Sequence, residues 1–515
     1  MTTKTHRSSK QAVERVLNRV LEWIVPTPRE RELVNEAFEK VKEVVVKVAA
    51  SKGLDLAFVE LGGSTGMKQT QLRNASDLDV FVGIPPESVL GPRSEWPRDR
   101  ASQKKRARPF LSSLVKQWLL PALHKLGVQN AILSYAEHPY VKGKFGGLEV
   151  DVVPCFDLSK EEIGREGPIT AVDRTPWHSR HVRDSLDEDA KNRARLLKQF
   201  CKAQHSYGDK SAPGRTGFVG YALELLAAQF GDLYSLFEQF DSLRKVAFDP
   251  LGRSADELRS QPRFSNDVLL VIDPVDPRRN VAASTSERSF LHVAARVGEF
   301  LAAPSEEFFR IEPIPLAARN HFPGEFAIVE FDADPKFHYT IPRDKLYALG
   351  QQVVRTAKTI DGGETRFDGV VFEEFFDAKL HRHALAFYYP GGPLSSTYVR
   401  KGPRHDRNGV SKFREKHPHA YLDGECWVVE ARRSFTRFSD FLADAVNRWA
   451  PKQYEYLKLA GPVFPVPDDE TPVVDSRGLP SPVGWMTLTA LKDMVLPHIS
   501  LSNGQHSTSG LHPRA

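Results

Sequence analysis

The 515-residue sequence is poor in cysteine, with only Cys155, Cys201 and Cys426. The three lie far apart and form no CxxC pair, which argues against a zinc site and against a disulfide framework. Such a composition is typical of a reducing compartment, so we expect a cytoplasmic location.

The sequence also lacks long apolar runs. None approaches the roughly 20 residues that a membrane-spanning helix needs, and no secretory hydrophobic segment precedes the first charges. We therefore expect no membrane partner. The net charge of +5 is only a weak sign of a phosphate-rich partner.

The length is too great for one compact core, so several domains are expected. Near the N-terminus, apolar residues between Val13 and Ile24 follow helical spacing and predict a packing helix. The polar end, residues 500–515, is predicted to be disordered.

One stretch is strongly basic: "RSEWPRDRASQKKRARP", from Arg93 to Pro109, which precedes the apolar pattern "FLSSLVKQWLLPALHKL". The second segment predicts a helix. For the first, two interpretations stay open: a solvated loop with a helix start, or a contact with nucleic acid.

Acidic side chains mark one predicted strand, "SDLDVFVGI", which contains Asp77 and Asp79. Side chains two apart on a strand point to the same face, so these two form one acidic patch. Two adjacent carboxylates are poorly tolerated without a cation, and oxygen ligands of this kind suit Mg²⁺.

A second acidic strand is predicted in "GGLEVDVVPCF", where Glu149 and Asp151 share a face. If this strand neighbours the first, Asp151 completes a cluster of three carboxylates. Such a cluster can hold two divalent ions roughly 3.5–4 Å apart, which activate an attacking hydroxyl and neutralise a leaving pyrophosphate.

A glycine-rich turn, "LGGSTG", precedes the acidic strands. Its glycines let the backbone approach a phosphate, and Ser64 offers a hydroxyl and an N–H. The turn, the DxD strand and the later Asp together are the signature of the polymerase-β-like nucleotidyltransferase superfamily. The alternative is a pair of surface aspartates on an edge strand.

Positive charge for a triphosphate is available in three later segments, "AVDRTPWHSRHV", "RARLLKQFCKAQHSYGD" and "VIDPVDPRRNVAAS". Their candidate side chains are Arg174, Thr175 and His178, then Arg195, Lys198, Lys202 and Tyr207, then Arg278 and Arg279. Taken singly, each also has a structural or solvated interpretation.

These segments, together with "YAEHPYVKGKFGGLEVDVVPCF", "GFVGYALELLAAQFG" and "FLAAPSEEFF", resemble in order the blocks of archaeal-type, class I CCA-adding enzymes. These are tRNA nucleotidyltransferases. The resemblance covers about residues 55 to 450, and "DRTPWH" with "DPVDPRRN" are its most specific parts.

The resemblance implies a role for each candidate residue. Asp77, Asp79 and Asp151 match the catalytic carboxylates, which bind two Mg²⁺ ions. Ser64 matches a phosphate-binding serine, and Arg279 an arginine near the base. Residues that match those holding the triphosphate and sugar are Thr175, His178, Lys198 and Tyr207.

The sequence departs from the family pattern at two places. The first carboxylate is commonly Glu, whereas this chain has Asp77. Three residues after the serine the family has an arginine, whereas this chain has Met67 followed by Lys68. We expect Lys68 to take the role of that arginine as a point charge without a bidentate fork.

The resemblance implies an α+β multidomain fold. A nucleotidyltransferase head with a mixed sheet occupies residues 1–160, and a helical neck 161–265. The body occupies 266–310 and 431–515, with a tRNA-binding tail at 311–430. The implied partners are tRNA, CTP and ATP, with pyrophosphate released and no template, and a homodimer is possible.

In the tail, "RKGPRHDRNGVSKFREKHPHAY" supplies charge for the tRNA backbone. Its cations are Lys401, Arg404, Arg407, Lys412, Arg414 and Lys416. Tyr421 and Trp427 are candidates for stacking on tRNA or for packing in a core.

Two other functions stay open at this stage. The first is another enzyme of the superfamily, a tRNA-blocking transferase or a cyclic-oligonucleotide synthase, against which the tail argues. The second is an inactive tRNA-binding protein, against which the three intact carboxylates argue.

Overall fold

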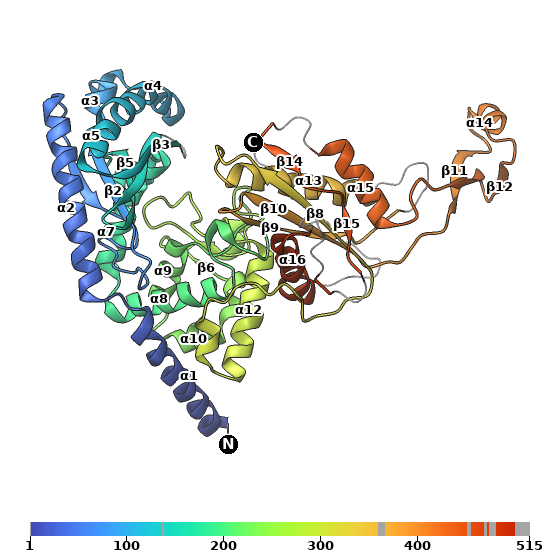
Figure 1. The fold of residues 1–515 in the computed structure, drawn as a ribbon, viewed down its shortest axis with the longest axis horizontal. Helices are drawn as coiled ribbons and strands as arrows, with labels where there is room; N and C mark the ends of the chain where they lie inside the picture. Colours follow the sequence, from blue (N-terminus) through green and yellow to red (C-terminus); the bar gives the residue numbers. More distant parts are fainter. Residues whose placement is uncertain are drawn as a thin grey trace. The chain divides into compact units, whose positions relative to one another are not determined.

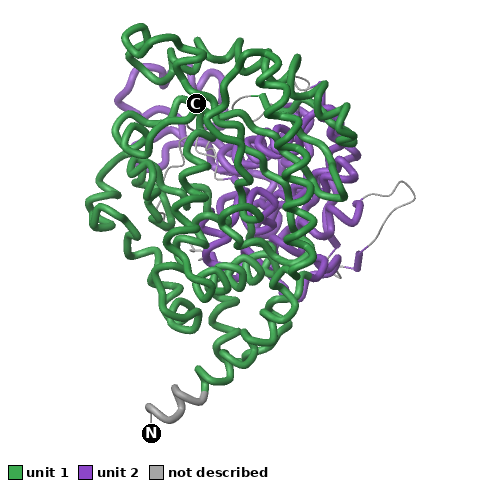
Figure 2. Tube along the Cα trace, turned by 90° about the vertical axis from the view of Figure 1, so that its left-hand side faces the viewer, with its two compact units in different colours: residues 1–207, 218–285, 293–311 green, residues 208–217, 286–292, 312–515 purple. Residues whose placement is uncertain are grey.

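The computed structural model describes residues 2–135, 139–358, 366–450, 455–467, 471–472 and 480–499. The predicted disordered end, 500–515, lies outside these residues. The chain divides into two compact units (Figure 2). Unit 1 comprises residues 1–207, 218–285 and 293–311, and unit 2 comprises 208–217, 286–292 and 312–515. The five-part division into head, neck, body and tail stays a prediction.

Unit 1 holds a mixed sheet in the order β1-β2-β5-β4-β3 (Figure 1). Only β2 and β5 run parallel; the other neighbours are antiparallel. The strands are β1 Phe58–Leu61, β2 Leu78–Ile84, β3 Gln129–Tyr135, β4 Pro139–Phe145 and β5 Leu148–Phe156. The mixed α+β head is thereby confirmed.

One face of β2 is apolar. Leu78, Val80, Val82 and Ile84 alternate along the strand and belong to the core that helix α2 (Pro28–Ser51) covers. Because side chains alternate, the opposite face of the same strand carries Asp79. Burial of the apolar face thus fixes the direction in which the carboxylate points.

The predicted N-terminal helix is α1 (Thr2–Ile24), and Val13, Val16, Leu17, Val20 and Ile24 are buried. The basic stretch is more helical than expected. After a short turn η1 (Arg93–Glu95), helix α4 (Arg100–Ser113) includes its second half. Asp99 caps this helix by accepting from the Ser102 amide. A π-helical turn, η2 (Leu114–Leu119), and α5 (Leu120–Leu126) continue it.

Helices dominate the rest of unit 1. They are α3 Glu87–Leu90, α6 Lys160–Glu166, η3 Ala171–Arg174, α7 Thr175–Ser185, α8 Glu188–Ala203, α9 Gly220–Gln229, α10 Leu233–Glu238, η5 Phe240–Lys245, α11 Ala255–Arg259, η6 Glu306–Phe309 and α12 Glu287–Ala302, whose residues up to His292 belong to unit 2. The short strands β6 Ala247–Phe248 and β7 Leu270–Val271 pair in parallel.

Unit 2 contains two antiparallel sheets. The larger has the order β14-β8-β10-β9, with β15 also on β8, and the smaller has β11-β13-β12. The elements are β8 Glu325–Ala333, α13 Thr340–Lys358, β9 Val371–Asp377, β10 Arg382–Tyr389, β11 Thr397–Arg404, α14 Val410–Lys416, β12 Tyr421–Asp423, β13 Cys426–Arg432, α15 Phe438–Trp449, β14 Leu457–Leu459, β15 Phe464–Pro465 and α16 Pro482–Thr489. Within the described ranges, no helix is long and apolar enough to cross a membrane.

Candidate active site

Two of the three predicted carboxylates stand opposite each other. The parallel pairing of β2 and β5 brings Asp79 into register with Asp151. Asp77 lies just before β2, two residues from Asp79, and its Oδ1 accepts a hydrogen bond of 2.7 Å from the Thr65 hydroxyl. The amide of Asp77 donates back to that hydroxyl at 3.2 Å. Glu149 is not part of this group, because its carboxylate pairs with Lys144 at 2.9 Å.

The carboxylates perturb one another. Burial, followed by the charges of Asp77 and Asp151, raises the pKa of Asp79 to about 7. Burial also raises the pKa of Asp151, against the opposing influence of Lys142, which is its register partner on β4. Two of the three carboxyl groups therefore have a raised pKa, although Lys68 and Lys142 oppose the shift of Asp79.

Asp151 has the chemistry of a ligand for a divalent cation. Asp151 Oδ1 is buried and has no hydrogen-bond partner, and carboxylate oxygens are the preferred ligands of hard cations. In the described part of the chain, no three His, Cys, Asp or Glu side chains are arranged so that together they could hold a metal ion, and Asp77, Asp79 and Asp151 are no exception. One oxygen of Asp77 is held by Thr65, so a cation must compete with this hydroxyl.

The glycine-rich turn lies against Asp79. The Gly62 amide donates to the Asp79 carbonyl at 2.8 Å. Gly63 has φ +64°, and a Cβ on it would collide with Asp79 Oδ2, so glycine is required there on two counts. The next residue is Ser64, whose carbonyl accepts from the Thr70 amide at 2.9 Å. The turn therefore places the predicted phosphate-binding serine beside the carboxylates.

Two of the predicted cations converge on one buried acid. Lys198 Nζ lies 2.7 Å from Glu224 Oε1, and Lys68 Nζ lies 2.9 Å from Glu224 Oε2. Thr70 Oγ1 donates to the same carboxylate and accepts from Lys198. Lys198 is 3% exposed and Glu224 1% exposed. Lys68 and Lys198 thus act as a pair held by Glu224, on α9.

Burial affects the two partners of this ion pair differently. It would raise the pKa of Glu224, but Lys198 and Lys68 outweigh it and hold the pKa at about 2. For Lys198, burial prevails over Glu224 and, aided by repulsion from Lys68, lowers the pKa. The shared carboxylate therefore remains charged while the two lysines compete for it.

A second cluster forms around Asp273. Its Oδ2 lies 2.8 Å from His178 Nε2 and 3.1 Å from Arg279 Nη1. The His178 ring stacks on Tyr221 with centroids 4.2 Å apart, and Lys68 Nζ lies 4.4 Å from the centroid of the same Tyr221 ring. Tyr221 thus connects the Asp273 cluster to the lysine pair.

Burial lowers the pKa of His178, although Asp273 opposes this effect. For Asp273, burial is outweighed by His178 and Arg279, and the pKa falls to about 2. The Arg279 side chain remains 40% exposed while its guanidinium is held by Asp273.

The remaining predicted residues also lie in unit 1. Thr175 begins α7, three residues before His178. Tyr207 follows α8, and a Cβ on Gly220 would lie 2.6 Å from its Oη and 3.4 Å from Lys198 Cε. Glycine at 220 therefore lets Tyr207 and Lys198 approach the same point. Burial raises the pKa of the Tyr207 phenol.

Three of the other candidate cations have structural partners. Arg195 is fully buried and donates to the carbonyls of Gln69 and Gln71. Arg174 and Arg278 both pair with Asp276, each at 3.0 Å. Of the candidate cations on α8, Lys198 and Lys202 remain, and the Lys202 ammonium lies 5.1 Å from the centroid of the Tyr207 ring.

Sequence reasoning missed four members of the site: Thr65, Tyr221, Glu224 and Asp273. A signal existed for Glu224, because it is the single acid in the apolar helix "GYALELLAAQ". Lone acids in such surroundings are rarely buried unless paired. For Asp273 and Tyr221 the sequence offers no comparable signal.

A mixed sheet with aspartates in register on parallel strands, beside a glycine-serine turn, defines a nucleotidyltransferase with a polymerase-β-like head. Residues 192–310 match the family described as tRNA nucleotidyltransferase, second domain. The chain is 30% identical over 455 residues to the CCA-adding enzyme of Halorubrum lacusprofundi, covering 84% of this chain and 89% of that protein. It is 33% identical over 465 residues to the CCA-adding enzyme of Methanopyrus kandleri, covering 84% and 86%. The chain belongs to the CCA-adding enzyme family.

Among solved structures, it is similar to CdnC of E. coli MS115-1 with ATP. The identity is 18% and the TM-score 0.41, over 57% of this chain and 94% of that one. This likeness is too low to bear on function.

Proposed function

We propose that this chain adds C, C and A to the 3′ end of tRNA, using CTP and ATP without a nucleic-acid template and releasing pyrophosphate. The observation that carries the proposal is the register of Asp79 with Asp151, with Asp77 beside them. The tRNA 3′-hydroxyl would attack the α-phosphorus at this group. Family membership supports the choice of substrate.

Asp77, Asp79 and Asp151 would hold divalent cations, which we propose to be two Mg²⁺ ions. When bound, they would activate the attacking hydroxyl and neutralise charge on the leaving pyrophosphate. The orphaned oxygen of Asp151 and the raised pKa of Asp79 support this role, since both groups gain from a cation.

The nucleotide would lie between the turn and the helices. Ser64 would approach its phosphates through the turn that Gly63 allows. Lys68 and Lys198 share one carboxylate, so the cluster retains one net positive charge for the triphosphate. Tyr207 and Lys198 come close to each other beside Gly220, which would let both side chains contact the triphosphate.

The sugar and base would meet the Asp273 cluster. Thr175 and His178 come from the start of α7, and Arg279 is fixed by Asp273 while still partly exposed. A guanidinium held in one orientation can read the hydrogen-bonding edge of a base.

The tail, residues 311–430, is proposed to bind tRNA by shape and backbone. The predicted cations Lys401 in β11, Arg407 in the loop that follows it, and Lys412 and Lys416 in α14 are exposed. Tyr421 is 51% exposed and free to stack. The Trp427 ring is instead covered by Arg414, whose Cζ lies 4.5 Å from the ring centroid. A cytoplasmic location and a possible homodimer stay predictions.

The experiment is incubation of the chain with Mg²⁺, labelled CTP or ATP, and tRNA that lacks its CCA end. Label in tRNA supports the proposal. Cyclic or blocked products would instead indicate another enzyme of the superfamily, and no turnover would indicate a binding protein.

A further inference from the structure

Exposed cations that no described acid neutralises lie just before α4, on α4 itself and on the following η2 turn. Arg98, Lys105, Arg108 and Lys116 are exposed, and none has a carboxylate partner among the residues that the structure describes. We call these four residues the basic stripe. Between Lys105 and Lys116 it extends about 16 Å at the usual helical rise.

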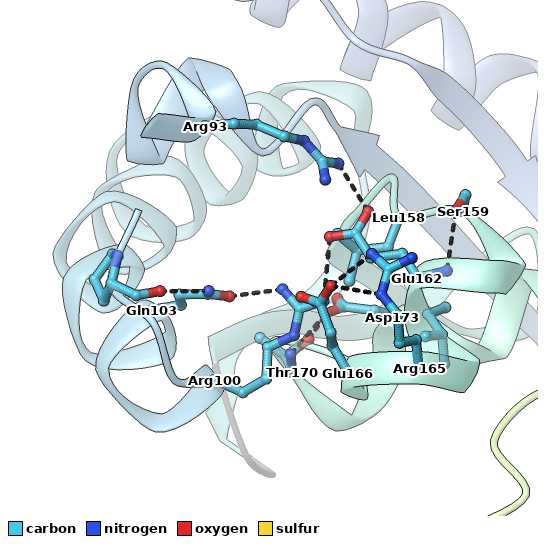
Figure 3. Close-up of polar contacts among 12 residues, drawn as sticks. Arg93, Arg100, Gln103, Leu158, Ser159, Glu162, Arg165, Glu166, Thr170 and Asp173 are labelled. Atoms are coloured by element: carbon cyan, nitrogen blue, oxygen red, sulfur yellow. Dashed lines mark hydrogen bonds and ion pairs between the residues drawn. The ribbon is translucent and has the colours of Figure 1, made fainter. Parts of the chain in front are cut away.

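Two arginines at the start of the same segment, Arg93 and Arg100, are neutralised by acids of α6 (Figure 3). Arg93 lies 2.7 Å and Arg100 3.1 Å from the two oxygens of Glu162, and Arg100 also lies 3.4 Å from Glu166. Acids from α6 thus neutralise these two arginines, whereas no described acid pairs with the four cations of the basic stripe.

Helix α2 shows the usual arrangement for a solvated surface. Its Arg29, Lys42 and Lys47 each pair with a glutamate three or four residues away. In the basic stripe, Lys105 and Arg108 stand three residues apart with like charge, which destabilises an isolated helix. Solubility alone does not explain a stripe of cations without acids, since a helix surface that alternates cations and acids, as on α2, is also soluble.

The opposite face of the helix is buried. Gln103, Ala107 and Leu111 contact the core, as does Leu114 in the π-helical turn. A membrane-surface helix needs its apolar face for insertion, and here that face is already covered. The arrangement favours a hydrophilic polyanion over a lipid surface.

We infer that the basic stripe binds the phosphate backbone of structured RNA. This inference rests on the proposed function, which makes tRNA the RNA concerned. Helix α4 follows the end of β2, while the carboxylates lie at its start, and a seven-residue strand spans about 20 Å. On this inference the stripe contacts phosphates other than the one at the reacting 3′ end, and these contacts add affinity without sequence information.

The test compares two triple variants with the same loss of charge. The stripe variant carries Lys105→Gln, Arg108→Gln and Lys116→Gln. The control carries Arg29→Gln, Lys42→Gln and Lys47→Gln on α2. The Kd for tRNA lacking CCA is measured for both and for the unchanged chain between about 50 and 200 mM salt.

The stripe variant should weaken binding at low salt at least about tenfold and reduce the slope of log Kd against log salt by about 2, given roughly 0.7–0.9 per phosphate contact. The control should keep the slope, and both should keep kcat at saturating tRNA. An unchanged slope in the stripe variant would overturn the inference, even if CCA addition is observed. Phosphatidylserine vesicles that bind the chain through the stripe, with the RNA slope unchanged, would overturn it in favour of a membrane.

If only the proposed function is wrong, the result differs. The slope of log Kd against log salt would still depend on the stripe, but the unchanged chain would incorporate no nucleotide into tRNA. The melting temperature of each variant confirms that it is folded, and it should not fall in the stripe variant because like charges are removed.

Discussion

Glu224 Oε1 and Lys198 Nζ lie 2.7 Å apart in a fully buried position, and the other oxygen of Glu224 holds Lys68 at 2.9 Å. Glu224 comes from α9, Lys198 from α8 and Lys68 from the segment just after the glycine-rich turn. One carboxylate therefore determines where both lysines proposed for the triphosphate are held. Its loss would affect the fold and the nucleotide site together.

Glu224→Gln should lower the free energy of unfolding by about 3 kcal/mol, because two buried ammonium groups lose their counter-charge. Urea unfolding at pH 7 measures this change. Glu32→Gln on α2 is the control: its carboxylate pairs with Arg29 at the surface, and the expected cost is within about 0.5 kcal/mol.

The cause can be separated from a general packing defect. In the Glu224→Gln background, Lys68→Met removes one uncompensated charge and should recover part of the lost stability. Strictly additive effects of the two substitutions would contradict the shared ion pair.

The stability of the cation-free protein should depend on Asp79. Its pKa is raised from its usual range near 3.8 to about 7, so the folded state retains a proton that the unfolded state releases. Stability should therefore fall as pH rises from about 4 to 7. In EDTA at pH 8, Asp79→Asn should raise the free energy of unfolding by about 1–3 kcal/mol. A lower stability for Asp79→Asn there would mean that the three carboxylates do not repel one another as described.

Lys68 should affect the binding of both nucleotides alike. Lys68→Ala is expected to raise the KM for CTP and ATP by a similar factor, and Lys68→Arg to be tolerated, if charge near the triphosphate is what matters. Steady-state kinetics with tRNA lacking CCA measures both. An unchanged KM in Lys68→Ala would leave the triphosphate to Lys198 and backbone N–H groups.

Arg279 should determine base choice. Cytosine and adenine present a ring-nitrogen acceptor beside an amino group, whereas uracil and guanine present a donor beside a carbonyl. Arg279→Ala should reduce the preference in kcat/KM for CTP and ATP over UTP and GTP, since each mispaired buried group costs about 1–3 kcal/mol.

The adjacent Arg278 provides the matched control for this prediction. It pairs with Asp276 and donates to the Ile163 carbonyl, so Arg278→Ala should leave the ratios among nucleotides unchanged. Equal loss of activity with all four nucleotides in Arg279→Ala would make Arg279 a phosphate or RNA contact.

The sequence predicted the local features of the head because they depend on local patterns. The apolar, β-branched segments at 78–84 and 148–156 indicated strands, and the period of two put Asp77 and Asp79 on one face. The pairing of Asp79 with Asp151 could only be assumed, since the register of parallel strands depends on contacts across some 70 residues of chain.

The buried ionic clusters were out of reach for the same reason. The role of Glu224 depends on lysines from two distant segments, and the role of Asp273 depends on His178 and Arg279. Arg195 was a candidate cation for the triphosphate because the sequence does not reveal that its guanidinium donates to the carbonyls of Gln69 and Gln71. Periodicity gives the face of a helix and not what covers it.

The central claim, template-independent CCA addition at the group Asp77, Asp79 and Asp151, is tested most directly by sequencing the 3′ ends of a tRNA lacking CCA after incubation with Mg²⁺, CTP and ATP. The account predicts C, C and A in this order for the unchanged chain. It predicts no addition for Asp79→Ala, which should still bind tRNA because phosphate contacts carry RNA affinity. Unextended tRNA with the unchanged chain, or near-normal extension with Asp79→Ala, would contradict it.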